Sequence, residues 1–149
     1  GLDIGLYSES RSEKEDEALR KLRYEAVREL TELNWAGEAD NLIKHFDYTL
    51  FEFEQGLCQK ANLIEAIEAL GMAGTHDAAV RLTLYLEVLN SYTESGQTVD
   101  EQIILEVISN LGDLGDSTAF DYLLYTGYLN YSSTVQRAAR EALENLKNI

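Results

Sequence analysis

The side chains that could do chemistry in this 149-residue chain are few, and they do not fall into a catalytic or metal-binding spacing. The two histidines, His45 and His76, lack the i, i+4 partner that would place two zinc ligands on one helix face. Cys58 is the only cysteine, with no Cys-x-x-Cys partner, so we interpret it as a small buried apolar residue. The sequence contains neither a Gly-x-Ser-x-Gly nucleophile elbow nor a glycine-rich phosphate loop. We therefore expect no enzymatic activity, no metal site and no cofactor.

Three aspartates, Asp113, Asp116 and Asp121, lie close enough in sequence to raise the question of a calcium site. An EF-hand loop needs alternating oxygen ligands, a central glycine and a bidentate glutamate at its end, and this run lacks that order. We interpret Asp113 and Asp116 as turn and helix N-cap residues. His76 is expected in an exposed turn, and His45 at the edge of the core.

The charge of the chain limits its partners. It has 12 basic and 27 acidic residues and a formal net charge of −15, which repels phosphate backbones and anionic membrane surfaces. No stretch has the length and apolarity of a membrane span, and the N-terminus carries no basic-then-apolar signal pattern. A single cysteine does not favour an oxidising compartment, so a cytoplasmic location is slightly favoured. We expect no nucleic-acid partner, and a partner protein whose docking segment is basic.

The pattern of apolar residues predicts helices throughout. The chain has no proline, and apolar residues recur at helical spacing between short glycine and polar turns. After a flexible N-terminus at 1–11, the expected helices are 12–34, 39–53, 57–70, 77–90, 103–111, 120–127 and 133–147. Asp77 is expected to cap the helix 77–90, whose inner side carries Val80, Leu82, Leu86 and Leu89. The core-facing side of the helix 120–127 is expected to carry Phe120, Leu123, Leu124 and Gly127. A loop is expected at 91–98. The run Tyr48–Phe53 alternates like a strand but has no partner strand, so we assign it to the second helix.

Two turns of the chain repeat each other. The segment Leu70–Ala78 superimposes on Leu111–Ala119 at an offset of 41 residues, pairing Gly71 with Gly112 and Gly74 with Gly115. A period near 40 with two helices per unit is typical of helical solenoids. We expect these four glycines to allow tight turns between antiparallel helices.

The Leu-Gly-x-[Ala/Leu]-Gly-[Thr/Asp] pattern of these turns, followed by alanine, resembles the HEAT-like repeats of the phycobilisome-lyase type. The run Val135–Leu143 resembles the first helix of one further unit. The resemblance covers residues 60–146 well and 18–53 loosely. It implies an all-α fold, an α-solenoid of about three antiparallel helix pairs with a C-terminal capping helix. The expected single domain spans 12–149, with units at 12–55, 57–91 and 99–131 and the capping helix at 133–147.

The resemblance also implies a class of function. Members of this family are mostly binding scaffolds, which implies a non-enzymatic protein that binds a partner protein through its concave face. Some members are lyases that attach bilins, so a lyase-like or chromophore-handling protein is the alternative, although no motif here transfers that activity. DNA-binding members need a basic groove, which this acidic chain does not offer. We expect a monomer or a weak oligomer.

Tyrosines at a spacing of three mark the candidate interaction surface. Four of the nine tyrosines are Tyr122, Tyr125, Tyr128 and Tyr131. The second helix of each HEAT-like pair usually lines the concave face, and the repeat offset brings the 81–87 segment beside these tyrosines. The residues expected on this surface are Arg81, Leu84, Tyr85, Tyr122, Tyr125 and Tyr128. Aromatic and arginine side chains concentrate binding energy at interfaces. The alternative is that the tyrosines pack between repeats with their hydroxyls in water.

The turn interpretation makes a stability prediction. If Gly71 and Gly112 adopt positive φ, replacing either by valine should lower the free energy of unfolding by about 1 kcal/mol or more. Unchanged melting of both variants would count against the repeat.

Overall fold

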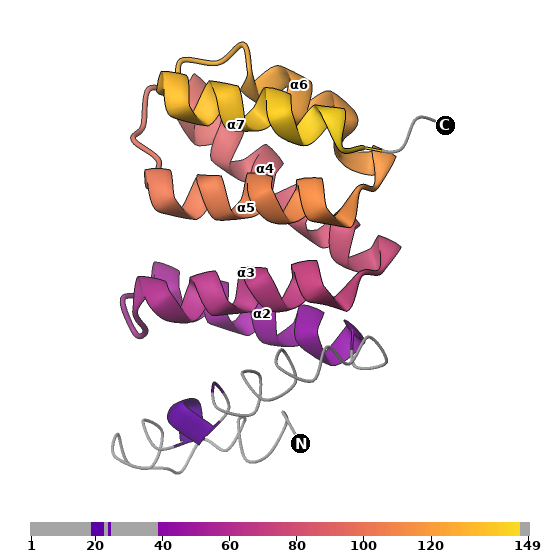
Figure 1. Ribbon diagram of the computed structural model, residues 1–149. Coiled ribbons are helices and arrows are strands. Elements are labelled where there is room, and N and C mark those ends of the chain that lie inside the picture. The colour runs from indigo at the N-terminus through magenta and orange to yellow at the C-terminus, as the bar shows by residue number, and fades with distance from the viewer. Residues whose placement is uncertain (1–18, 23, 25–38, 147–149) are drawn as a thin grey trace.

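The computed structural model describes residues 19–22, 24 and 39–146 of the chain (Figure 1). The described helices are α2 (Ala39–Glu54), α3 (Lys60–Ala73), α4 (His76–Glu94), α5 (Glu101–Leu114), the short 3-10 helix η2 (Ser117–Ala119), α6 (Phe120–Thr126) and α7 (Ser133–Glu144). Residues 19–22 and 24 are also helical. Within the described residues no strand occurs, and Tyr48–Phe53 lies inside α2, which confirms the all-α prediction for this part of the chain. The predicted N-terminal segment 1–11 and most of the predicted helix 12–34 lie outside the described residues.

Glycines with positive φ end two of the helices. Gly74, with φ of 68°, is the C-cap of α3, and Gly115, with φ of 64°, is the C-cap of α5. Only glycine adopts this left-handed conformation without steric cost. The repeat offset of 41 residues therefore relates two equivalent helix ends, as the turn interpretation expected for these two positions.

The same interpretation is wrong for the other two glycines. Gly71 lies inside α3 and Gly112 inside α5, and neither has positive φ. The prediction that α3 stops at 70 was therefore too short, because the helix continues to Ala73. The N-cap of α4 is Thr75, whose hydroxyl accepts a hydrogen bond from Ala78 N at 3.2 Å, and not Asp77. At its other end α4 extends to Glu94, into the segment 91–98 that was expected to be a loop.

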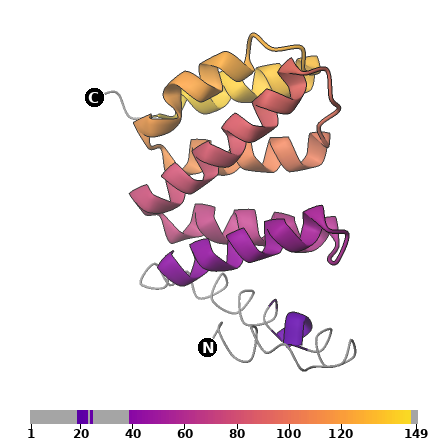
Figure 2. The ribbon, with the colours of Figure 1, turned by 180° about the vertical axis from the view of Figure 1, so that it is seen from behind.

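The described helices form two layers. Figure 1 shows α3, α5 and α7 in front, stacked and running in the same direction, and the reverse view in Figure 2 shows α2, α4 and α6 in front. Helix α5 packs against both α3 and α7. The core between the layers is built from residues at helical spacing, such as Ile104, Ile108 and Leu111 of α5, which are fully or almost fully buried.

Helix α4 connects the two ends of this arrangement. It crosses obliquely behind α5, from the level of α3 to that of α6 (Figures 1 and 2). It contacts α2, α3, α5, η2 and α6. The apolar positions Leu82, Leu86 and Leu89 lie on its buried side, as the sequence pattern predicted. The opposite side of α4 is thereby exposed to solvent.

The helical glycines allow the front layer to pack closely. A Cβ atom placed on Gly71 would lie 2.0 Å from Oδ1 of Asn110, and one on Gly112 would lie 3.3 Å from the Cβ of Ala142. The first distance is a collision and the second is a tight contact. Gly71 thus brings α5 against α3, and Gly112 brings α7 against α5.

We predict that Gly112→Val lowers the free energy of unfolding by about 1–3 kcal/mol, because the added methyl groups would collide with α7 at Ala142. The matched control is Ser109→Val, which places the same β-branched side chain at an exposed position of the same helix. Urea unfolding followed by circular dichroism measures both variants. Equal losses of stability in the two would contradict the packing role of Gly112.

Candidate protein-interaction surface

Helix α4 presents an apolar stripe to solvent. Leu84, Val88 and Tyr92 are exposed and follow one another at a spacing of four residues, so they share one face of the helix. Leu84 is 49% exposed. Leu84 was expected on the interaction surface, whereas Val88 and Tyr92 were missed, although the i+4 and i+8 spacing from Leu84 would have identified them.

Helix α6 adds further exposed apolar residues. Phe120, Leu124 and Tyr125 are exposed on this short helix, and Tyr125 is the residue that the repeat offset pairs with Leu84. Phe120 and Leu124 were predicted to face the core, and this is wrong. In α6 the fully buried apolar side chain is Leu123. Tyr128 is 80% exposed and follows the end of the helix.

We call the exposed apolar side chains of these two helices the α4/α6 surface. Its members are Leu84, Val88, Tyr92, Phe120, Leu124 and Tyr125.

A buried polar network holds α6 against α4. The side chain of Asn90, on α4, is buried, and its Oδ1 accepts hydrogen bonds from the hydroxyls of Thr126 at 3.2 Å and Tyr131 at 2.8 Å. Its Nδ2 donates to the backbone carbonyl of Tyr122 at 3.4 Å. Tyr131 is therefore half-buried, and its hydroxyl is bonded to Asn90 and not in water as the alternative interpretation of the tyrosines expected. Because every polar atom of the Asn90 amide is used, the network fixes how α6 presents Tyr125.

Two of the predicted surface residues have other roles. Tyr85 is only 5% exposed and packs edge to face against Phe46, with ring centroids 5.6 Å apart, so it belongs to the core and its assignment to the surface is wrong. Arg81 lies over the Phe46 ring at 4.8 Å and donates to Asp47 of α2. Tyr122 is half-buried. The structure therefore exposes Leu84 on α4 and Tyr125 on α6, and places Tyr85 in the core.

The surroundings of the α4/α6 surface are acidic. Helix α4 carries Asp77, Glu87 and Glu94, all exposed, and α6 carries Asp121, also exposed. Glu94 accepts a hydrogen bond from Tyr125, which raises the pKa of that phenol. The only lysine or arginine on these two helices is Arg81, which is paired with Asp47. A cationic group approaching this surface therefore meets a negative potential.

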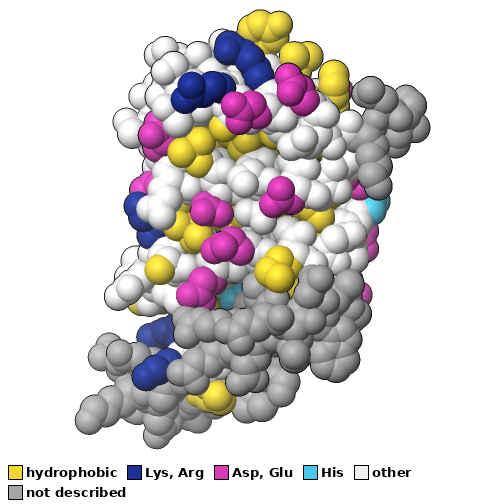
Figure 3. Space-filling model, viewed as in Figure 1, with side chains coloured by type: hydrophobic (Ala, Val, Ile, Leu, Met, Phe, Trp, Pro, Cys, Tyr) yellow, Lys and Arg dark blue, Asp and Glu magenta, His cyan; other side chains and the backbone are white. Residues whose placement is uncertain are grey.

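The opposite side of the molecule has a different character. Figure 3 shows the α3, α5 and α7 side with acidic side chains interspersed with small, separate groups of hydrophobic atoms. Helix α7 exposes Arg137 and Arg140 there, together with Glu141 and Glu144. Scattered apolar atoms of this kind are ordinary for a soluble protein surface.

Among the described residues, a cluster of side chains that could take part in chemistry lies against α2. Tyr24 donates to Oε1 of Glu52 at 3.2 Å, and Arg20 forms an ion pair with Oε2 at 3.5 Å. Glu52 is only 2% exposed, and His45, stacked edge to face on Tyr24, is also buried and not merely at the core edge. Burial raises the pKa of Tyr24. These contacts fasten Arg20 and Tyr24 to α2.

Cys58 is partly exposed and not buried as predicted. Its thiol donates to the backbone carbonyl of Thr49 at 3.7 Å. Partial burial of the thiol raises its pKa, and this disfavours the nucleophilic thiolate form. Among the described residues no group of three potential metal ligands occurs, and no helix is long and apolar enough to cross a membrane.

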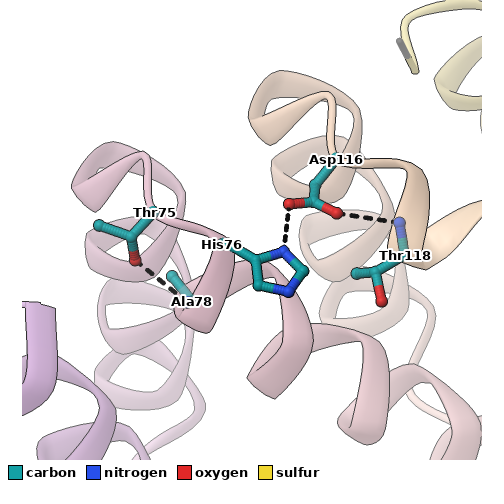
Figure 4. A network of polar contacts seen from close by, with 5 residues as sticks. All are labelled: Thr75, His76, Ala78, Asp116 and Thr118. Atoms are coloured by element: carbon teal, nitrogen blue, oxygen red, sulfur yellow. Dashed lines mark hydrogen bonds and ion pairs between the residues drawn. The ribbon is translucent and has the colours of Figure 1, made fainter. Parts of the chain in front are cut away.

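Consecutive repeat turns contact each other through His76 and Asp116. Figure 4 shows the imidazole of His76, at the start of α4, directed at Asp116, at the start of η2, with 2.7 Å between Nδ1 and Oδ2. The other carboxylate oxygen of Asp116 accepts from Thr118 N at 2.9 Å, as expected for an N-cap. The turns flank a hollow of about 320 Å³, and the His76 side chain is 67% exposed, as predicted. This contact ties the turn between α3 and α4 to the turn between α5 and η2.

We predict that the contact makes stability depend on pH. The hydrogen bond to Asp116 raises the pKa of His76, so the stabilisation is complete below the ordinary histidine pKa of about 6.5 and is lost as pH rises through the higher folded value. The melting temperature of His76→Gln should therefore fall below that of the wild type at about pH 5.5 by more than at about pH 8.5. Asp116→Asn, which keeps an acceptor for Thr118 N, should behave in the same way. An unchanged difference at both pH values would contradict a protonated pair.

Comparisons with known proteins do not place the chain in a family. Neither the protein-family models nor the curated proteins nor the solved structures give a match to it. Function is therefore inferred from the geometry of the described residues.

Proposed function

We propose that this chain is a non-enzymatic interaction protein that binds a basic, apolar-containing segment of another protein through the α4/α6 surface. The observation that carries the proposal is the exposed stripe of Leu84, Val88 and Tyr92 on α4. The adjoining helix α6 exposes Leu124 and Tyr125, and both helices carry exposed carboxylates. Because these exposed apolar groups lie on two helices that are fixed to each other, they provide apolar surface that a partner can bury on binding. The carboxylates favour a partner that carries positive charge.

Charge argues for a protein and against a nucleic acid. The chain has a formal net charge of −15, and Arg81, the only lysine or arginine on α4 or α6, is held by Asp47. A nucleic-acid interface needs several unpaired cations to neutralise phosphates. A lysine- or arginine-containing segment instead gains from Glu87, Glu94 and Asp121.

We further propose that the fold is an α-solenoid of HEAT-like units, with α7 as its capping helix. Two equivalences at an offset of 41 residues support this. Gly74 and Gly115 end α3 and α5 in the same left-handed conformation, and Gly71 and Gly112 occupy equivalent helical positions at which α3 meets α5 and α5 meets α7. The binding face of such a solenoid would be the layer of α2, α4 and α6.

The proposal predicts which peptides the chain selects. From a random peptide display library, the immobilised chain should enrich peptides that combine lysine or arginine with apolar residues. A synthesised member of that set should bind Leu84→Ser/Tyr125→Ser at least about tenfold more weakly, because its apolar contacts are lost. Binding to the wild type should weaken as salt is raised. Isothermal titration calorimetry measures both effects.

The matched control is Leu57→Ser/Met72→Ser, which removes two apolar residues that are equally exposed but lie outside the α4/α6 surface. It should bind as the wild type does, and both variants should keep the helical circular dichroism of the wild type. Enrichment of acidic or neutral peptides, no enrichment, or unchanged affinity of Leu84→Ser/Tyr125→Ser would refute the proposal.

A further inference from the structure

A second hollow lies next to the α4/α6 surface, where two connections come together. The α4–α5 and α6–α7 connections lie on the same side of the molecule, at the left of Figure 1 and the right of Figure 2. They enclose a pocket of about 290 Å³. Thr93 in its wall follows Tyr92 directly, and Tyr131 follows the helix that carries Tyr125. The pocket therefore borders the proposed binding surface.

The lining of this pocket combines an apolar floor with a polar rim. Val99 is the half-buried apolar residue of the floor, and Ile104 and Val135, which also line the pocket, are almost completely buried. The rim is made of hydroxyl and amide groups, with Thr98 and Asn130 among them. Small-ligand pockets typically have this composition, an apolar wall with a few placed polar groups.

One charged residue lines the pocket, and it is acidic. The carboxylate of Glu101 accepts a hydrogen bond from the Ser132 hydroxyl at 2.5 Å, and that hydroxyl also accepts from Val135 N at 3.2 Å. Ser132 is the N-cap of α7, so the capping contact holds Glu101 in place. No lysine, arginine or histidine is among the lining residues. Lys60 pairs with the neighbouring Asp100, at 3.2 Å.

We infer that this pocket takes a lysine or arginine side chain from the bound partner. The aliphatic stem packs on Val99, the most accessible of the three apolar lining residues, and the cation lies against Glu101. An anion would meet the Glu101 carboxylate with no cation to offset it. The inference rests on the proposed function, which supplies the partner that carries this side chain. Binding of that lysine or arginine in the pocket would fix the position of the partner segment along the α4/α6 surface.

Small probes test the pocket without the partner. Methyl NMR spectra follow Ile104, Val135 and Val99 during titration with n-butylammonium, n-butylguanidinium and the neutral n-butanol. We expect saturable shifts of these methyl groups, with a Kd for a cationic probe about fivefold or more below that of n-butanol at low salt. Glu101→Gln, which can still accept from Ser132, should abolish this preference. Glu141→Gln, at an exposed position of α7, should preserve it.

The outcomes separate the two proposals. Equal binding of the cationic and neutral probes, a preference that survives in Glu101→Gln, or no saturable shift would overturn the inference. It would do so even if basic peptides still bound through Leu84 and Tyr125. Failure of peptide selection, with cation preference intact in the pocket, would instead refute the proposed function.

Discussion

The arrangement of the described helices depends on the approach of α5 to α3 at Gly71. The Oδ1 atom of Asn110 occupies space that any other residue at position 71 would fill with its Cβ. A weaker steric constraint of the same kind operates between α5 and α7, where Gly112 lies against Ala142. Because these contacts bring the front helices close together, the buried residues of α5 can pack against two neighbours at once. The turn glycines Gly74 and Gly115 then return the chain to the other layer.

Because of this packing, the two layers have different roles. The front layer closes on itself through small residues, whereas α4 crosses obliquely and keeps Leu84 and Val88 in solvent. The Asn90 network fixes α6 to α4, so Tyr125 and Leu124 are presented from a rigid support. Exposed apolar groups on such a support lose little conformational entropy when they bind, which is the physical basis for proposing them as an interface.

The sequence predicted the helices better than it predicted their surfaces. Periodicity placed Leu82 and Leu86 of α4 in the core, and the repeat offset identified Gly74 and Gly115 as helix ends. It could not separate a turn glycine from a glycine needed for close packing, because both occur near a helix end and only the neighbouring helix distinguishes them. Phe120 and Leu124 were misassigned because α6 is a single short helix of seven residues, too short for its apolar period to define a face. The pocket could not be predicted either, because it forms where two connections meet the ends of α4, α5 and α7, and periodicity within one helix does not show which ends lie together.

The most direct test of this account is a double-mutant cycle between Gly71 and Asn110, measured by urea unfolding. If the two residues set the distance between α3 and α5, Gly71→Ala should destabilise the wild-type background, and Asn110→Ala should remove much of that loss by vacating the colliding atoms. The account predicts a coupling free energy of about 1 kcal/mol or more. Additive losses, or a gain in stability from Gly71→Ala alone, would contradict the claim that this contact organises the fold.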